Sequence, residues 1–152
     1  MADNLTPEQR SMTMSRIRST NTKAEMIIRC LLHSRGLRYR IHAAELPGKP
    51  DIVFPSSKVI VFIDGDFWHG WRFSLWEHKL QPYWRSKIAG NRRRDRLNFQ
   101  RLRRQGWTVI RIWEHQVKRD PVSCADRIET VVRNAKVEPG SEITAISALA
   151  GK

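Results

Sequence analysis

The sequence predicts one α/β domain with a mixed sheet flanked by helices. Short apolar runs rich in β-branched residues, at positions 52–54, 59–63 and 107–113, are typical of buried strands. Segments with capping signals and helical spacing of apolar residues alternate with these runs. A chain of 152 residues, of which 40% are hydrophobic, suits a single core. We expect the domain at residues 21–137.

Net positive charge is the strongest compositional signal. Lys and Arg number 28, against 15 for Asp and Glu. The arginines that crowd one segment are Arg92, Arg93, Arg94, Arg96, Arg101, Arg103 and Arg104. Planar guanidinium groups bind phosphate well, so nucleic acid is the expected partner. A charge that served only solubility would not explain this clustering.

The sequence also argues against several classes of protein. No apolar run approaches the ~20 residues of a membrane span, and the N-terminus lacks a signal-peptide core. We therefore expect a protein inside the cell with no membrane partner. Cys30 and Cys124 lie far apart in helix-like segments, which fits reduced packing residues better than a disulfide or a zinc site.

Residues 1–20 are predicted to form a basic helical arm that contacts DNA. Thr6 and Pro7 are a helix-start signal, and the helix is expected to continue to about residue 19. Only a thin apolar stripe, to which Met14 belongs, lies among its arginines. Two interpretations stay open: an arm that becomes ordered on DNA, or a helix that packs at the domain's edge.

The first half of the domain combines a core helix with a hairpin. A capping box at residues 22–25 opens the helix, so Glu25 has a structural explanation as a cap. A strand with one buried face is predicted at residues 37–41. The strands at 51–54 and 59–63 are joined by a tight turn. We therefore expect Asp51 to lie beside the end of the second strand.

A long basic helix at residues 83–105 follows. Its inward face is predicted to contain Trp84, Ile88, Asn91, Asp95, Phe99 and Leu102. Asp95 is the carboxylate in this stripe, so it needs an arginine, a histidine or a metal-bound water as its partner.

The last elements are a strand, a helix and a tail. Gly106 ends the long helix, and residues 107–113 form a strand. Asp120 and Pro121 start the last helix. We expect the tail at residues 138–152 to be mobile or loosely docked.

Residues at the end of the central strand point to hydrolysis of phosphodiesters. This reaction needs a divalent cation held by hard oxygens, a water molecule and a base. Asp51 and the carbonyl of Ile63 could bind the cation, and His69 could be the base. Each residue alone has a structural explanation. Together with the basic helix they predict a metal-dependent nuclease, with a non-catalytic binder of distorted DNA as the alternative.

The order and spacing of several motifs resemble the very short patch repair (Vsr) endonucleases. These motifs are S-M-T-M-S-R-I at residues 11–17, A-E at 24–25, L-P-G-K-P-D at 46–51, V-F-I-D-G-D-F-W-H at 61–69, Y-W-R-S-K-I at 83–88, N-R-R-R-D at 91–95 and G-W-T-V-I-R-I-W-E at 106–114. The resemblance implies a restriction-endonuclease-like fold of the PD-(D/E)xK superfamily. It implies an enzyme that uses Mg²⁺ to nick one strand of duplex DNA 5′ to the T of a T:G mismatch.

The expected setting follows from this activity. We expect a monomer in the bacterial cytoplasm, associated with the nucleoid, with mismatch-repair proteins as partners. A related nuclease of different specificity, from a restriction system or a mobile element, is the nearest alternative.

The resemblance also implies roles for single residues. Asp51 would bind the metal directly, the carbonyl of Ile63 would be a further ligand, and His69 would be the general base. Asp95 would orient His69, and Glu25 would hold a water molecule on the metal.

Contacts with DNA are implied as well. Phe67, Trp68 and Trp84 match the family's aromatic wedge, which inserts beside the mismatch, and Met14 matches a residue that inserts from the other groove. The physics agrees, since unstacking costs a few kcal/mol and costs least at a mismatch. The DNA contacts expected on the long helix are Arg92, Arg93 and Arg96.

Two features depart from the family. Well-known members carry a structural zinc at the positions held here by Asp66, Trp71, Phe73 and His115. Only His115 could ligate zinc well, so we predict no zinc site. We expect packing of Trp71 and Phe73, and an Asp66 to His115 hydrogen bond, to hold the loop instead. Asp64 stands where those members have a histidine, so it either adds a metal oxygen or caps the loop.

Overall fold

The computed structural model describes Thr6 and residues 21–150, with side chains as far as residue 135. Met14 and the rest of the predicted arm, apart from Thr6, lie outside the described residues. In the described part of the chain, no helix is both long enough and apolar enough to cross a bilayer.

The strands of the described residues form one mixed sheet, as predicted. They are β1 (Arg40–Ile41), β2 (Ile52–Phe54), β3 (Val59–Asp64) and β4 (Thr108–Trp113), in that order across the sheet. The β1–β2 and β2–β3 pairs are antiparallel, whereas β3 and β4 are parallel. The strand expected at residues 37–41 is reduced to β1, which is the exposed edge of the sheet.

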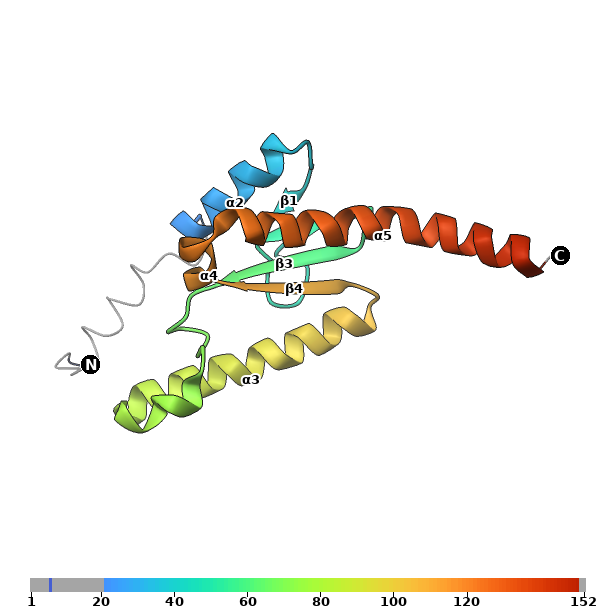
Figure 1. Ribbon diagram of the computed structural model, residues 1–152. Coiled ribbons are helices and arrows are strands. Elements are labelled where there is room, and N and C mark those ends of the chain that lie inside the picture. Colours follow the sequence, from blue (N-terminus) through green and yellow to red (C-terminus); the bar gives the residue numbers. More distant parts are fainter. Residues whose placement is uncertain (1–5, 7–20, 151–152) are drawn as a thin grey trace.

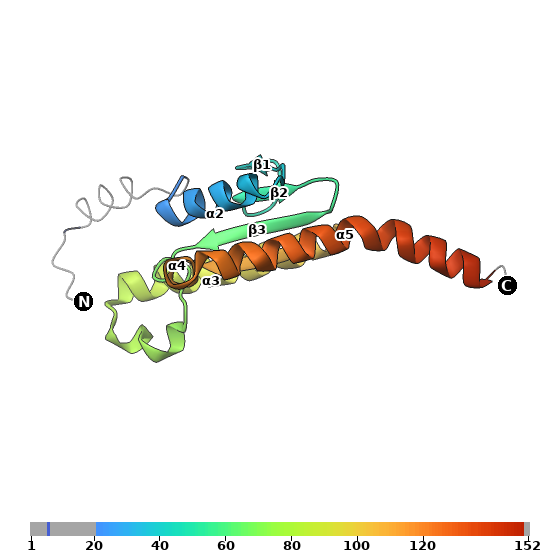
Figure 2. The ribbon, with the colours of Figure 1, turned by 45° about the horizontal axis from the view of Figure 1, so that its top comes forward.

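Helices cover both faces of the sheet (Figures 1 and 2). On one face lie α2 (Lys23–Ser34) and α5 (Pro121–Ala150), and on the other lies α3 (Pro82–Arg104). The short elements are η1 (Phe73–Leu75) and η2 (Glu77–Lys79) before α3, and α4 (Glu114–Arg119) after β4. A parallel strand pair needs a long crossover connection, and α3 supplies it between β3 and β4.

Alternating side chains of β3 divide the core into two layers. Val61 and Ile63 pack with residues of α2 and α5, whereas Ile60 packs with Phe99 and Leu102 of α3. Every residue of β3 is buried. This confirms the prediction of a central strand covered on both faces, and it explains why the polar end of β3 is also buried.

The inward stripe predicted for the long helix is confirmed in α3. Trp84, Ile88, Phe99 and Leu102 are buried. Asn91, on the same face, donates from Nδ2 to the carbonyl of Trp68 at 2.8 Å. This bond ties the loop that follows β3 to the helix.

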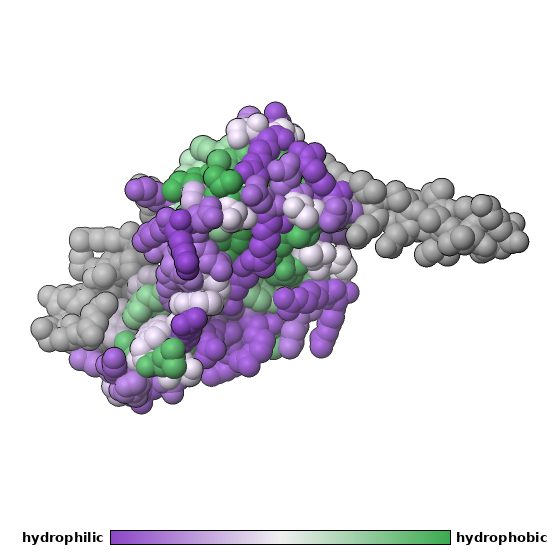
Figure 3. Space-filling model, viewed as in Figure 1, coloured by the Kyte–Doolittle hydropathy of each residue, from purple (hydrophilic) through white to green (hydrophobic). Residues whose placement is uncertain are grey.

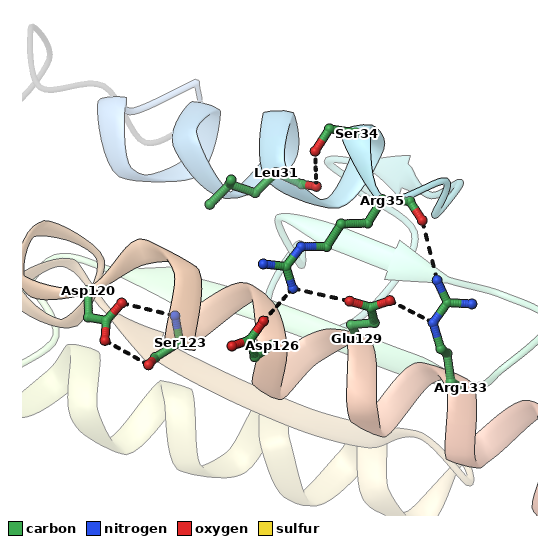
Figure 4. Close-up of polar contacts among 8 residues, drawn as sticks. All are labelled: Leu31, Ser34, Arg35, Asp120, Ser123, Asp126, Glu129 and Arg133. Atoms are coloured by element: carbon green, nitrogen blue, oxygen red, sulfur yellow. Dashed lines mark hydrogen bonds and ion pairs between the residues drawn. The ribbon is translucent and has the colours of Figure 1, made fainter.

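Ion pairs fasten α2 to α5 (Figure 4). The guanidinium of Arg35 lies 2.6 Å from a carboxylate oxygen of Asp126 and 3.1 Å from one of Glu129. At the start of α5, Asp120 accepts hydrogen bonds from the amide and the hydroxyl of Ser123. These bonds confirm the predicted start of the last helix.

The end of the last helix differs from the prediction. α5 continues to Ala150, past the Pro139-Gly140 pair at which the sequence indicated a tail, and its C-terminal part extends beyond the sheet (Figure 1). Helix-favouring alanine and leucine are frequent at residues 145–150, which favours the helical backbone on the far side of this pair. Mobility of residues 138–152 stays a prediction.

The loop between β3 and α3 is held by contacts of its side chains, including contacts with His115 of α4. Nδ1 of His115 lies 2.7 Å from Oδ1 of Asp66, which confirms the predicted hydrogen bond. The ring of Trp71 lies 4.8 Å from the imidazole of His115, and Phe73 is buried. Packing and this hydrogen bond therefore hold the loop as expected, while the lack of zinc stays a prediction.

The loop also depends on Gly70, and Gly70→Ala tests this. Gly70 has φ of 72°, and a Cβ there would lie 2.6 Å from Cδ of Arg92. We expect a loss of about 1–3 kcal/mol in the free energy of unfolding, measured by urea denaturation. The matched control is Gly90→Ala in α3, where a Cβ meets nothing within 4 Å, so it should stabilise by roughly 0.5–1 kcal/mol. Equal effects of the two changes would contradict this account of the loop.

Candidate active site

A cleft of about 730 Å³ opens at the C-terminal end of β3. Its lining includes Asp51, Ile63, Asp64, His69 and Asp95. These residues come from the position directly before β2, the end of β3, the following loop and α3. The structure thus brings together Asp51, His69 and Asp95 of the predicted catalytic residues, whereas Glu25 is not among the lining residues but lies near Asp51.

Asp51 lies beside the end of β3, as predicted from the hairpin. The amide of Ile63 donates to Oδ2 of Asp51 at 2.7 Å, and the amide of Asp51 donates to the carbonyl of Val61 at 3.1 Å. Both polar groups of a strand residue point to the same edge of the strand, so the carbonyl of Ile63 also leaves β3 on the Asp51 side. The two predicted metal ligands therefore face one region.

Burial sets the protonation of Asp51, whose exposed fraction is 8%. Loss of hydration raises its pKa to about 8, the Ile63 amide opposes this rise, and the charges of Glu25 and Asp64 add to it. Without a cation, the Asp51 carboxyl is therefore mostly neutral at pH 7. A divalent cation would favour the carboxylate form.

Glu25 is enclosed by polar partners. Its carboxylate lies 2.7 Å from Nε2 of His42 and 3.1 Å from Nη1 of Arg29, and it accepts from the amide of Asn21 at 3.2 Å. Glu25 thus caps the start of α2, as predicted. Its carboxylate accepts from the backbone amide of Asn21, where a standard capping box would use the backbone amide of Thr22. His42 was missed by the sequence analysis because it follows β1 in a turn without periodic pattern, where it has φ of 49°.

His69 and Asp95 form a closely bonded pair. Nδ1 of His69 lies 2.7 Å from Oδ2 of Asp95. A carboxylate only accepts, so Nδ1 carries the proton and Nε2 can take another. Burial alone would lower the pKa of His69, but the bond to Asp95 and the charges of Asp64 and Asp95 outweigh it and raise the pKa.

Arg111 is a second residue that the sequence analysis missed. Its Nε lies 2.8 Å from Oδ2 of Asp64, and its Nη2 lies 2.7 Å from Oδ2 of Asp95. The guanidinium also lies 4.1 Å from the ring of Trp113 and 5.0 Å from the ring of Phe99. The available signal was a lone charged residue in an otherwise apolar stretch of the last strand.

Asp64 is buried in the same cluster. Its side chain is 6% exposed, and Oδ1 lies 3.5 Å from Nε2 of His69. Burial raises the pKa of Asp64, although His69 and Arg111 both oppose the rise. Asp64 lines the cleft and also binds Arg111.

Two groups of side chains among the described residues could hold a metal ion. One is Glu25, His42 and Asp51, and the other is Asp64, His69 and Asp95. In each group, the ligand atoms lie within 4.8 Å of one another. The buried carboxyl of Asp51, whose hydrogen-bond donor is the backbone amide of Ile63, suits a hard divalent cation, so the residues present fit such an ion.

The predicted wedge residues lie together, and Trp68 lines the cleft. Ring centroids are 5.1 Å apart for Phe67 and Trp68, and 5.6 Å apart for Trp68 and Trp84. Phe67 also stacks on Trp76 at 5.7 Å. Trp84 is only 9% exposed, whereas Phe67 and Trp68 are half-buried. In this arrangement, Trp84 supports the other two rings from below.

The predicted arginine contacts are exposed on α3. Arg92 and Arg96 line a second hollow beside His69, together with Arg72 and Arg103, whereas Arg93 does not. Hydrophilic side chains cover much of the surface over α3 in Figure 3. A basic surface therefore continues directly from the cleft.

Replacement of Asp51 by Asn tests the cost of the buried carboxylate. Asp51 has a raised pKa when folded, so its contribution to stability is fully present below its ordinary pKa and is lost as pH rises towards about 8. Without divalent metal, Asp51→Asn should be more stable than the wild type. The difference in the free energy of unfolding between Asp51→Asn and the wild type should increase between pH 5 and pH 8, by at most about 1.4 kcal/mol per pH unit. Denaturation at several pH values measures it, and a difference that stays constant would contradict the account.

Comparison with known proteins gives the family. Residues 2–75 match the family described as DNA mismatch endonuclease Vsr. A type II nicking enzyme of Xanthomonas oryzae, V.XorIIP, is 44% identical over 75% of this chain and 85% of its own length. V.NmeDIP, a type II nicking enzyme of Neisseria meningitidis, is 38% identical over 87% of this chain and 91% of its own. The DNA mismatch endonuclease Vsr of Escherichia coli is 35% identical over 75% of this chain and 74% of its own length. By these similarities, the chain belongs to the Vsr family of DNA endonucleases.

Proposed function

We propose that this protein nicks one strand of duplex DNA 5′ to the T of a T:G mismatch, with Mg²⁺ as its metal. The observation that carries the proposal is that the His69 to Asp95 pair and the buried Asp51 line one cleft, next to a hollow lined by arginines. Family membership and the Vsr mismatch endonuclease of Escherichia coli among the relatives support it. Activity as a monomer on the bacterial chromosome, with repair proteins as partners, is part of the proposal.

Asp51 and the carbonyl of Ile63 would hold the cation. Both are hard oxygen donors, which Mg²⁺ prefers. When bound, Mg²⁺ would polarise the scissile phosphate and offset the charge that develops there. Glu25 lies close to Asp51 and would order water at this end of the cleft. Asp64 is not part of this set of ligands, since Arg111 already binds it.

His69 would act as the general base. Its Nε2 would accept a proton from the attacking water, because Asp95 fixes the proton on Nδ1. Asp95 also stabilises the imidazolium that results. Because the pKa of His69 is raised, the increase of activity with pH should lie at higher pH than it would for an ordinary histidine base.

The aromatic and basic surfaces would select and hold the substrate. Phe67 and Trp68 would insert beside the mismatch, where stacking is weakest, while Trp84 supports them. Arg92 and Arg96 would bind the phosphates that flank the cut. Arg93 and Met14 remain predicted contacts.

A second candidate function differs only in the target. Several relatives are named type II nicking enzymes, so a nuclease with another recognition sequence fits the same site. A binder that does not cut DNA fits less well, because it gives no role to the His69 to Asp95 pair.

A nicking assay tests the proposed function. Duplexes with a T:G mismatch or full pairing, labelled on either strand, are incubated with Mg²⁺. We expect a nick 5′ to the mismatched T, and a loss of roughly 10²–10⁴-fold with Asp51→Ala or His69→Ala. No nick on any duplex, or full activity of Asp51→Ala, would contradict the proposed catalysis. Equal cutting of both duplexes would favour the second candidate.

Trp68→Ala in the same assay tests the wedge. It should lower the preference for mismatched over paired DNA more than it lowers general DNA affinity, since the ring acts only where bases unstack. The control is Leu75→Ala, an apolar residue of η1 that is 64% exposed. An equal loss on both duplexes would argue against insertion.

A further inference from the structure

Arg111 lies where two carboxylates of the site meet. It binds Asp64 through Nε and Asp95 through Nη2, at 2.8 and 2.7 Å. Asp95 in turn binds His69, and His69 lies 3.5 Å from Asp64. The four side chains therefore form a closed ring of charged contacts, in which Arg111 is the permanent cation.

The rest of the fold holds this guanidinium in place. Arg111 comes from β4, the strand parallel to β3, so its backbone is fixed by the central sheet. Its planar group lies against the rings of Trp113 and Phe99. Its side chain is 25% exposed, so the charge is only partly screened by water.

The same carboxylates could otherwise attract a metal ion. Asp64, His69 and Asp95 have ligand atoms within 4.8 Å of one another. A guanidinium hydrogen-bonded to two of them already compensates their charge, and it would repel a dication at this distance. The Glu25, His42 and Asp51 group differs, because Arg29 binds Glu25 at 3.1 Å, whereas Asp51 accepts from the backbone amide of Ile63 and is 8% exposed.

We propose that Arg111 is the positioning residue that takes the place of a second metal ion at Asp64, His69 and Asp95. It holds Asp64 and Asp95, and through Asp95 it fixes the orientation of His69. Asp64 is then not a metal ligand in the wild type, and Asp51 belongs to the one divalent-cation site of the cleft. This inference rests on the proposed function for the role of the cluster, but its test does not.

The number of bound Mn²⁺ ions tests the proposal, counted by electron paramagnetic resonance of free Mn²⁺ with the full chain and no DNA. We expect one ion in the wild type and none in Asp51→Asn. Arg111→Met keeps an apolar side chain against Trp113 but removes the cation, so the count should rise from one to two. Arg111→Lys retains a cation and should stay at one.

Two controls make the count specific. Arg127→Met removes an arginine that donates to the backbone carbonyl of Arg111 and to neither carboxylate, so the count should stay at one. The double change Arg111→Met with Asp64→Asn should return the count from two to one.

Several outcomes would overturn the proposal: two ions in the wild type, one ion that persists in Asp51→Asn, or one ion in a folded Arg111→Met. If circular dichroism shows that Arg111→Met does not fold, the wild-type and Asp51→Asn counts decide. Nicking by the wild type is measured separately, so absence of nicking would remove the proposed function while these counts still test Arg111.

Discussion

The burial of a carboxylate at the end of the central strand is the constraint on which the site depends. Helices cover both faces of β3, so Asp51 meets little water where it lies beside Ile63. Its one backbone donor does not offset the lost hydration, and its pKa stays near 8. The fold thus favours the neutral form of the Asp51 carboxyl near pH 7, and a bound divalent cation would favour the carboxylate form.

At the second acidic group, Asp64 and Asp95, a side chain of the protein compensates the buried charge. Asp64 and Asp95 are also poorly exposed, but Arg111 lies between them and His69 completes the ring. A permanent cation costs no binding step and fixes the geometry of the imidazole. The cleft therefore combines two acidic sites. Asp51 requires a bound cation for its charged form, whereas Asp64 and Asp95 are paired with Arg111, and the proposed base His69 belongs to this second site.

Much of this arrangement could be predicted from the sequence, because local patterns decide it. The apolar run of β3, the stripe of α3 and the short turn before β3 place Asp51, His69 and Asp95 correctly. Arg111 and His42 could not be predicted in the same way. Their partners lie 47 and 17 positions away, and only the packed sheet brings them together. The continuation of α5 past Pro139 was not expected for the opposite reason, since a local break signal was given too much weight.

The most direct test of the central claim is the number of protons released when Mg²⁺ binds. Titration calorimetry at pH 6.5, in buffers with different ionisation enthalpies, gives this number for the chain without DNA. A neutral Asp51 carboxyl must lose its proton to bind the cation, so we expect close to one proton per Mg²⁺, falling towards zero by pH 9.5. Binding of Mg²⁺ at pH 6.5 with no release of protons would contradict the account.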